Sequence, residues 1–249
     1  MLYPAELRAH DVRVPASRRG GQWSGLAAAL LLAAPVGAGE EAAWRSVGEG
    51  LVVELADAPS LRLAELAPEV PAATLERWLQ PGPLQFAVVG PAERDGHLPA
   101  MVRQGDEESL QARLVAAGLA RVWPGHGDEL AAELLVLEDE ARAAGRGRWG
   151  SGEFRILDAV PPPAVEGFVI LRGEVASVGR TDRFLYLNFD RRFREAVSVR
   201  VRPRDGRAWG LTQHLDDLVG RVVEVRGYAF EDGGPMLELD HPAQLRVVD

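Results

Sequence analysis

The chain contains no cysteine and no lysine among its 249 residues. Without cysteine it cannot form a disulfide, carry a lipoprotein anchor or hold a cysteine-ligated metal. Its stability must therefore come from an apolar core, for which a hydrophobic content of 47% is ordinary. All 28 basic residues are arginine, which we interpret as a compositional habit of the source genome rather than as a functional signal.

The chain also lacks an apolar run of the roughly 20 residues that a membrane span needs. Its best candidate, Leu26 to Val36, follows Arg18 and Arg19 and ends in small residues at Ala38. This order is typical of a secretory signal peptide. We predict that residues 1–38 are an N-terminal extension and signal peptide, that the protein is exported to the periplasm or secreted, and that no stable membrane span remains after cleavage. A retained anchor and a twin-arginine signal are the alternatives.

Acidic residues are concentrated in the first half of the chain. Residues 39–166 hold 11 Arg against 22 Asp and Glu, a balance of -11, whereas residues 167–249 hold 13 against 13, a balance of zero. A surface that binds nucleic acid normally supplies clustered positive charge. The first half is therefore not expected to bind DNA or RNA tightly, although its charge would permit contact with a basic protein.

A proline run at Pro161 to Pro163 separates a helix-containing part from a strand-rich part. We predict a first domain at residues 39–160, a proline-rich linker at 161–166 and a second domain at 167–249. In the first domain, alternating residues around a turn at Asp57 to Ser60 predict a hairpin. The expected strands are residues 50–55, 61–66, 84–89 and 99–103. The expected helices are residues 72–80, 110–117 and 130–141, the last two followed by Gly118 and Gly145.

The second domain is expected to be nearly all strand, with one short helix. The strands are at residues 168–178, 184–189, 197–201, 222–230, 236–239 and 244–248, and the helix is at 210–218. This pattern favours a Greek-key barrel of the OB type, with an immunoglobulin-like sandwich as the alternative. The predicted fold class is α+β and mainly β, in which a barrel with covering helices is followed by a second small barrel.

Residues 109–150 contain two helical segments, LQARLVAAGLARV and LLVLEDEARAAGRGRWG. These segments resemble the thermonuclease family, the staphylococcal-nuclease-like domain, in the form common in secreted bacterial members. The resemblance implies an SNase-like OB barrel for the first domain. Because the matching Leu, Ala and Gly positions are structural, it supports the fold and says little about activity.

In that family, phosphodiester hydrolysis uses carboxylates that hold calcium, a glutamate that activates water, and two arginines that stabilise charge on phosphorus. Against the family's motifs, Leu51 stands where the first metal-binding aspartate belongs. Arg62 keeps the first arginine, and His97 stands in place of the second. If the segment is aligned with the family's second motif from Arg62 onward, Ala67 and Val70 stand where the second aspartate and the glutamate belong.

If the segment is aligned instead from Pro68 and Glu69, with one residue deleted, Glu69 stands at the position of the glutamate, but the aspartate is still absent. We therefore predict a catalytically inactive member without a metal or cofactor, in which Arg62, Glu69 and His97 are relics. Arg62 is expected to pair with Glu54 or Glu65 across the hairpin rather than to contact phosphate. The alternative is a calcium-dependent phosphodiesterase with displaced ligands, for which His97 could serve as general acid. Its metal ligands would come from Glu49, Glu54 or Asp57.

In the second domain, residues 184–207 interleave aromatic residues with seven arginines from Arg191 onward. Aromatic and arginine side chains on OB strands bind single-stranded nucleic acid, because bases stack on rings while guanidinium groups contact phosphates. The alternative is that the aromatic residues fill the barrel while the arginines lie on its solvated face. The candidate residues for nucleic-acid or anion binding are Tyr186, Arg191, Arg192, Arg194, Arg200 and Arg202.

The tetrad at Tyr186 to Phe189 and the turn at Gly233 to Met236 also resemble a barrel appended to some secreted thermonuclease-like proteins. The sequence as a whole predicts an exported, inactive thermonuclease-like protein that acts as a binding or scaffold module. The sequence does not name a partner, and a protein and a single-stranded nucleic acid are the two candidates. The alternatives are the displaced-ligand phosphodiesterase and a non-cleaving binder of single-stranded nucleic acid that uses the second domain.

Overall fold

The computed structural model describes residues 40–105, 107–163, 167–192 and 196–248. The predicted leader at residues 1–38 lies outside the described residues, as does Arg194. Among the helices in the described ranges, none is both long enough and apolar enough to cross a membrane. Export stays a prediction.

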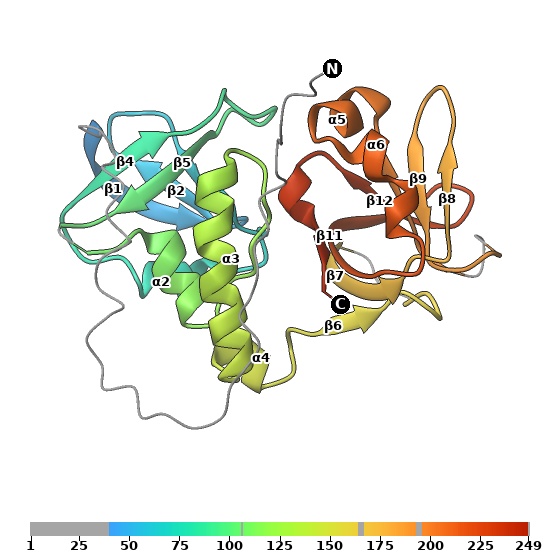
Figure 1. The fold of residues 1–249 in the computed structure, drawn as a ribbon. Helices are drawn as coiled ribbons and strands as arrows, with labels where there is room; N and C mark the ends of the chain where they lie inside the picture. Colours follow the sequence, from blue (N-terminus) through green and yellow to red (C-terminus); the bar gives the residue numbers. More distant parts are fainter. Residues whose placement is uncertain (1–39, 106, 164–166, 193–195, 249) are drawn as a thin grey trace, which may run out of the picture. The chain divides into compact units, whose positions relative to one another are not determined.

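The first part of the chain forms a closed barrel of five strands (Figure 1). The strands are β1 (Glu40–Gly48), β2 (Val52–Leu55), β3 (Leu61–Leu63), β4 (Pro83–Val88) and β5 (Leu98–Arg103). Their order is β1-β2-β3-β5-β4, and β1 pairs with β4 to close the barrel. β3 and β5 are parallel, whereas the other pairs are antiparallel. The expected hairpin is confirmed as the pair of β2 and β3.

The side chains of these strands alternate between the interior and the outer face of the barrel, as strand geometry requires. Leu61 and Leu63 on β3 and Leu84 and Phe86 on β4 are at most 3% exposed and belong to the core. Arg62 lies between the two β3 leucines and is half-buried. The alternation therefore places Arg62 on the outer face of the barrel.

Four helices accompany the barrel. They are α1 (Ala72–Glu76), α2 (Leu110–Ala116), α3 (Asp128–Ala143) and α4 (Gly147–Gly150). The two longest, α2 and α3, confirm the helices expected from leucine spacing, and they lie side by side (Figure 1). The Ser109 side chain begins α2 by accepting a hydrogen bond from the Ala112 N–H at 3.1 Å. Buried Gln111 then bonds the backbone of Ala100 and Val102 and attaches α2 to β5.

The end of α2 lies directly against the residues that lead into α4. Gly118 has a φ of 70°, and a Cβ at this position would lie 2.2 Å from the carbonyl oxygen of Arg146. Gly147 has a φ of 51°, and its Cβ would lie 2.5 Å from the carbonyl oxygen of Ala117. Only glycine fits this backbone conformation and this close approach without movement. These two glycines therefore have a packing role.

The rest of the chain forms a second sheet. Its strands are β6 (Ile156–Asp158), β7 (Gly167–Glu174), β8 (Ser177–Arg180), β9 (Leu185–Asn188), β10 (Ser198–Val201), β11 (Val222–Glu231), β12 (Pro235–Leu239) and β13 (Leu245–Val247). The order is β6-β7-β11-β12-β10-β9-β8, with β13 paired to β11. The prediction of a single strand at residues 168–178 is wrong in one respect, because Val175 and Ala176 separate β7 from β8.

The short helix expected at residues 210–218 is also corrected. It consists of α6 (Leu211–His214) and a 3-10 turn, η1 (Asp216–Leu218), and it follows a further helix, α5 (Pro203–Ala208). Another 3-10 turn, η2 (Pro242–Gln244), precedes β13. Gly210, which has a φ of 71°, separates α5 from α6.

The two sheets follow the same strand path when β7 and β8 are counted as two segments of one bent strand. The chain then runs from β7 and β8 to β9 and β10, and β10 pairs in parallel with β12. β11 lies between β12 and β7 and is antiparallel to both. The helical turns follow β10, just as α1 follows β3 in the first barrel. The structure is thus a mixed α+β fold with a closed five-stranded barrel and a second sheet.

One strand from before the proline run belongs to the second sheet. β6 pairs in parallel with β7, so that Ile156 lies opposite Ile170. The described residues of both sheets fall in a single compact unit. The domain boundaries at residues 160 and 167 stay a prediction.

Buried ion pairs connect the second sheet to α3. Arg226 on β11 bonds Glu138 on α3 at 2.7 Å. Its neighbour on the same face, Glu224, is 2% exposed and contacts Arg142 on α3 at 3.2 Å and Arg246 on β13 at 2.8 Å. Buried charges are tolerated only when they are paired in this way.

Candidate functional site

The outer face of the first barrel carries a charged cluster around Arg62. The guanidinium group donates to Asp95 at 2.7 Å and forms a second ion pair with Glu93. Both carboxylates belong to the loop between β4 and β5. The expectation that Arg62 pairs with Glu54 or Glu65 is therefore wrong, because β3 pairs with β5 and brings this loop beside Arg62.

The cluster is held by charge and extends to His97. The pKa of Asp95 lies below its usual value, chiefly because Arg62 donates a hydrogen bond to it. The Nε2 atom of His97 lies 3.9 Å from the Asp95 carboxylate, which is beyond hydrogen-bond distance. The Nε atom of Arg62 is buried and has no hydrogen-bond partner within the described ranges. The structure thus places Arg62 and His97, which were predicted to be remnants of an active site, in the same charged cluster.

Leu51, Ala67 and Val70, the residues that the resemblance aligned with two aspartates and a glutamate, are part of the core. Leu51 is fully buried, although its φ of 65° lies in the left-handed region that leucine rarely adopts. Ala67 and Val70 are each 1% exposed. Within the part of the chain that the structure describes, no three His, Asp or Glu side chains are grouped so that they could hold a metal ion.

The third relic candidate, Glu69, lies in a different environment. It accepts a hydrogen bond from the Nε atom of Arg121 at 3.0 Å, and Arg121 also donates to the carbonyl oxygen of Phe168 at 2.8 Å. The Arg121 guanidinium lies over the rings of Phe154 and Phe168 at 4.9 Å from each centroid. Glu69 therefore helps to join β7 to the first barrel.

Tyr228 on β11 belongs to the same region. Its ring packs edge-on against Trp123 and Phe168, with centroids 5.0 Å and 5.8 Å apart. Burial raises the pKa of the Tyr228 hydroxyl to about 12, and the negative charge of Glu69 adds to this effect. The hydroxyl therefore stays protonated at any physiological pH.

A histidine–carboxylate pair close to the charged cluster was not expected from the sequence. The Glu65 side chain is fully buried, accepts the backbone N–H groups of Gly125 and His126 at 3.2 Å and 2.6 Å, and lies 3.3 Å from the His126 Nδ1 atom. The His126 ring also packs on Gly90, where a Cβ would lie only 3.0 Å away. In the sequence, His126 stands between Gly125 and Gly127, and this local pattern does not indicate a partner 61 residues earlier.

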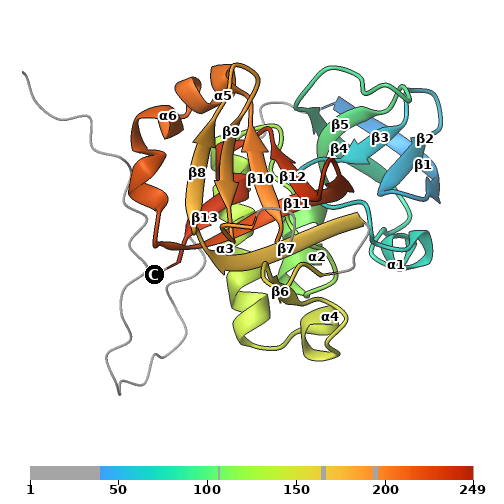
Figure 2. The same cartoon turned by 90° about the vertical axis from the view of Figure 1, so that its right-hand side faces the viewer.

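The second sheet carries the other candidate surface, on its outer face. β8, β9, β10 and β12 run side by side here (Figure 2). Leu185, Leu187 and Phe189 point into the core, whereas Phe184 and Tyr186 are half-buried on the outer side. The alternative that the aromatic residues fill the interior therefore holds for Phe189 and is wrong for Phe184 and Tyr186.

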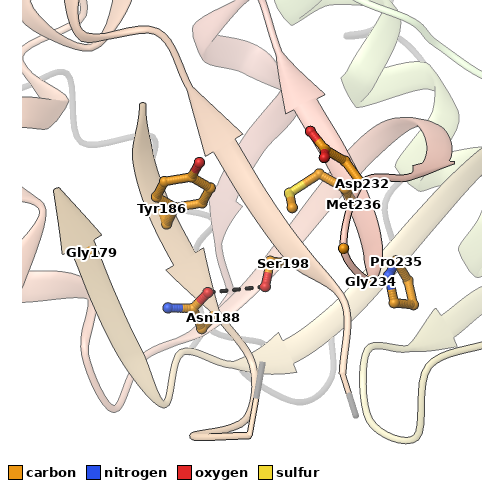
Figure 3. Close-up of a pocket in the computed structure, with 9 residues that line it drawn as sticks. Gly179, Tyr186, Asn188, Ser198, Asp232, Gly234, Pro235 and Met236 are labelled. Carbon is orange, nitrogen blue, oxygen red and sulfur yellow. Dashed lines mark hydrogen bonds between the residues drawn. The ribbon is translucent and has the colours of Figure 1, made fainter. Parts of the chain in front are cut away.

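A cleft of about 350 Å³ opens on this face. Figure 3 shows Tyr186 and Asn188 on one side, Met236 and the Asp232 to Pro235 turn on the other, and Ser198 between them. Gly179 on β8 lies opposite Tyr186 and presents no side chain to the cleft.

The base of the cleft is a chain of neutral hydrogen bonds. The Ser198 hydroxyl donates to the Asn188 carbonyl oxygen at 3.0 Å, and the Asn188 amide donates to Ser177 at 3.3 Å. Ser198 is only 4% exposed, so its orientation is fixed by its neighbours. The two side chains come from adjacent strands whose register places Ser198 opposite Asn188.

Arg200 lies beside the cleft, but carboxylates engage all of its guanidinium nitrogens. It contacts Glu238 at 2.8 Å and 2.7 Å and Asp232 at 2.6 Å. Its guanidinium carbon also lies 4.2 Å and 4.8 Å from the ring centroids of Phe184 and Phe230. Arg200 therefore positions the Asp232 turn, and its positive charge is already balanced by two carboxylates.

Among the residues that the structure describes, the other predicted arginines are dispersed. Arg202 is exposed and contacts Glu238 at 2.8 Å. Arg191 and Arg192 are exposed in the turn after β9, where the Arg192 backbone N–H bonds Asp190 at 2.7 Å. Of the predicted binding residues that the structure describes, Tyr186 and Arg200 are therefore brought to the cleft, and only Tyr186 lines it. Asn188, Ser198 and Asp232 line it as well and were not singled out from the sequence.

Comparison with known proteins adds no assignment. No protein-family model matches the chain, and no curated protein sequence matches it.

Proposed function

We propose that this chain is a non-catalytic binding module, related to thermonucleases, that holds a ligand in the cleft on the outer face of the second sheet. The observation that carries the proposal is the convergence of Tyr186, Asn188, Ser198 and Asp232 on a cleft of about 350 Å³. Small-molecule sites are concave, of about 300–1,000 Å³, and combine apolar walls with a few placed polar groups.

The strand path supports the fold part of the proposal. Five strands in the order β1-β2-β3-β5-β4, with a helix after the third, are the arrangement that an OB barrel requires. In such barrels the second and third strands and the adjoining loops form the ligand face. The corresponding strands of the second sheet are β9 and β10, which hold Tyr186 and Ser198.

The charged cluster supports the absence of nuclease activity. Two carboxylates bind Arg62, so its charge is already neutralised and it cannot stabilise a pentacoordinate phosphorus without losing them. Leu51 and Ala67 offer no ligand for a cation, and both lie in the core. Export remains part of the proposal on the basis of the leader sequence alone.

Hydrolysis assays on the purified chain lacking residues 1–38 test the proposal that the protein has no nuclease activity. We expect no cleavage of single-stranded DNA or RNA with calcium or with EDTA. Cleavage that requires calcium and is lost in Arg62→Ala would overturn it. Arg180→Ala serves as the control, because this exposed arginine pairs with Asp216 away from the cluster.

The displaced-ligand phosphodiesterase is the second candidate, and Glu93 and Asp95, rather than the expected Glu49, Glu54 or Asp57, are the carboxylates that the structure brings to Arg62. Glu93 and Asp95 pair with different nitrogens of the same Arg62 guanidinium. In Arg62→Ala both carboxylates become free to bind a cation. Calcium has a preference for six to eight oxygen ligands, so we expect no calcium-dependent rise in thermal stability in either wild type or Arg62→Ala. A rise in wild type that is absent in Asp95→Asn would favour this candidate.

A further inference from the structure

We infer that the ligand of the cleft is an uncharged saccharide. This inference rests on the proposed binding function and names its ligand class. It follows from the charge, the hydrogen-bonding groups and the aromatic wall of the cleft.

The charge of the cleft is balanced within the protein. Among the described residues that line the cleft, Asp232 is the only one with a side chain that is charged at neutral pH, and it pairs with Arg200 at 2.6 Å. Arg200 is held in turn by Glu238 and by two aromatic rings. Binding to a nucleic-acid backbone depends on cations that can replace its counterions, and the charge of Arg200 is already balanced by these two carboxylates. An uncharged ligand needs no such cation.

The free hydrogen-bonding groups include both donors and acceptors. Asn188 uses one amide hydrogen for Ser177 and retains the other, and Ser198 retains an acceptor lone pair. Asp232 binds Arg200 through Oδ2 and keeps Oδ1 as an acceptor. Each sugar hydroxyl both donates and accepts, so the mixed donors and acceptors on both sides of the cleft match a polyhydroxylated ligand (Figure 3).

Tyr186 supplies the apolar wall that a sugar ring needs. The Phe184 ring packs against it edge-on, with centroids 6.0 Å apart, and holds it in place. Across the strand pair, Gly179 leaves space beside the Tyr186 ring. An aromatic ring with a polar hydroxyl offers one surface for the C–H groups of a sugar and another for its hydroxyls.

Gly179 provides a test that does not depend on removing a binding group. Its φ is not in the left-handed region, and a Cβ would lie 3.5 Å from Tyr186, which is ordinary van der Waals contact. Gly179→Val should therefore fold while filling the cleft. Gly125→Val is the matched control, because a Cβ at this position has nothing within 4 Å and the loop belongs to the first barrel.

The experiment measures binding of the chain lacking residues 1–38 to an array of immobilised neutral cello-, malto- and chito-oligosaccharides, with a short oligothymidylate in parallel. We expect at least one saccharide family to bind with little dependence on salt. Affinity should fall tenfold or more in Tyr186→Ala and in Gly179→Val, and should be unchanged in Gly125→Val. Thermal unfolding confirms that each variant is folded.

The outcomes that would overturn the inference can be distinguished from one another. If no saccharide binds but oligothymidylate binds and is blocked by Gly179→Val, the cleft is a binding site and the saccharide assignment is wrong. If neither probe binds, or if binding persists in Gly179→Val, both the assignment and the proposed use of the cleft fail. Oligothymidylate binding that weakens with salt and with Arg191→Ala and Arg192→Ala would indicate the nucleic-acid alternative.

Discussion

Arg226 on β11 and Glu138 on α3 form a 2.7 Å ion pair in which the side chains are 3% and 0% exposed. Both also bond the backbone of Val122: Glu138 accepts its N–H at 2.7 Å, and Arg226 donates to its carbonyl oxygen at 3.0 Å. The pair therefore links the second sheet, α3 and the segment that precedes α3.

Replacing Arg226 with Met should destabilise the protein by about 3–5 kcal/mol, because Glu138 would be left as a buried charge without its partner. Urea unfolding measures the loss. Arg180→Met is the control, since the Arg180–Asp216 pair is exposed and its removal should change stability much less. Equal losses in the two variants would contradict a special role for the buried pair.

Stability should fall as the pH is lowered below about 4.5, in part because of Glu224. Burial opposes its ionisation, but attraction from Arg246, Arg142 and Arg226 outweighs burial and lowers its pKa from the ordinary 4.5. A carboxyl group with a lowered folded-state pKa stabilises the fold above 4.5 and loses this contribution as the pH falls through the folded pKa. Unfolding titrations of wild type and Glu224→Gln should show a weaker pH dependence in the variant. An unchanged slope would exclude Glu224 as a contributor.

Gly118→Ala should destabilise the chain more than Gly105→Ala. Both glycines have a positive φ, 70° and 58°, so each alanine incurs a backbone cost of about 1–2 kcal/mol. At Gly118 the new Cβ would also meet the Arg146 carbonyl oxygen at 2.2 Å, whereas Gly105 has nothing within 4 Å. The difference between the two unfolding free energies isolates the packing contribution. A difference near zero would mean that the backbone at Gly118 and Arg146 moves apart without loss of stability.

Tyr228 should titrate near pH 12 rather than near 10. Because its folded pKa is raised, the stability that depends on the neutral hydroxyl is complete below pH 10 and is lost as the pH rises toward 12. The tyrosinate absorbance of wild type minus that of Tyr228→Phe gives the titration of this residue alone. A midpoint at pH 10 would show that the hydroxyl is solvated.

Much of the strand and helix pattern was predictable because local alternation and leucine spacing determine it. Leu185 and Leu187 face the core as their period of two predicts. β1 was missed because most of its side chains are exposed and its only large apolar residues are Trp44 and Val47. β6 was missed because three residues carry no period of their own, and it is a strand only through its pairing with β7.

The candidate sites were less predictable because they depend on pairings across the sheets. Arg62 was singled out from the family motif, but its partners Glu93 and Asp95 are brought to it by the parallel pairing of β3 and β5. Tyr186 was singled out as an aromatic residue. Its partner in the cleft, Asp232, lies 46 residues away in a turn whose position depends on β12 pairing with β10.

The shared backbone contact at Val122 also bears on how the sequence can change over generations. A single replacement of Glu138 or Arg226 leaves a buried charge without a partner, whereas exchanging both for apolar residues of similar volume can be neutral. Substitution at one position should therefore be tolerated only together with substitution at the other. Among related sequences, positions 138 and 226 should covary, either as a glutamate–arginine pair or as two apolar residues.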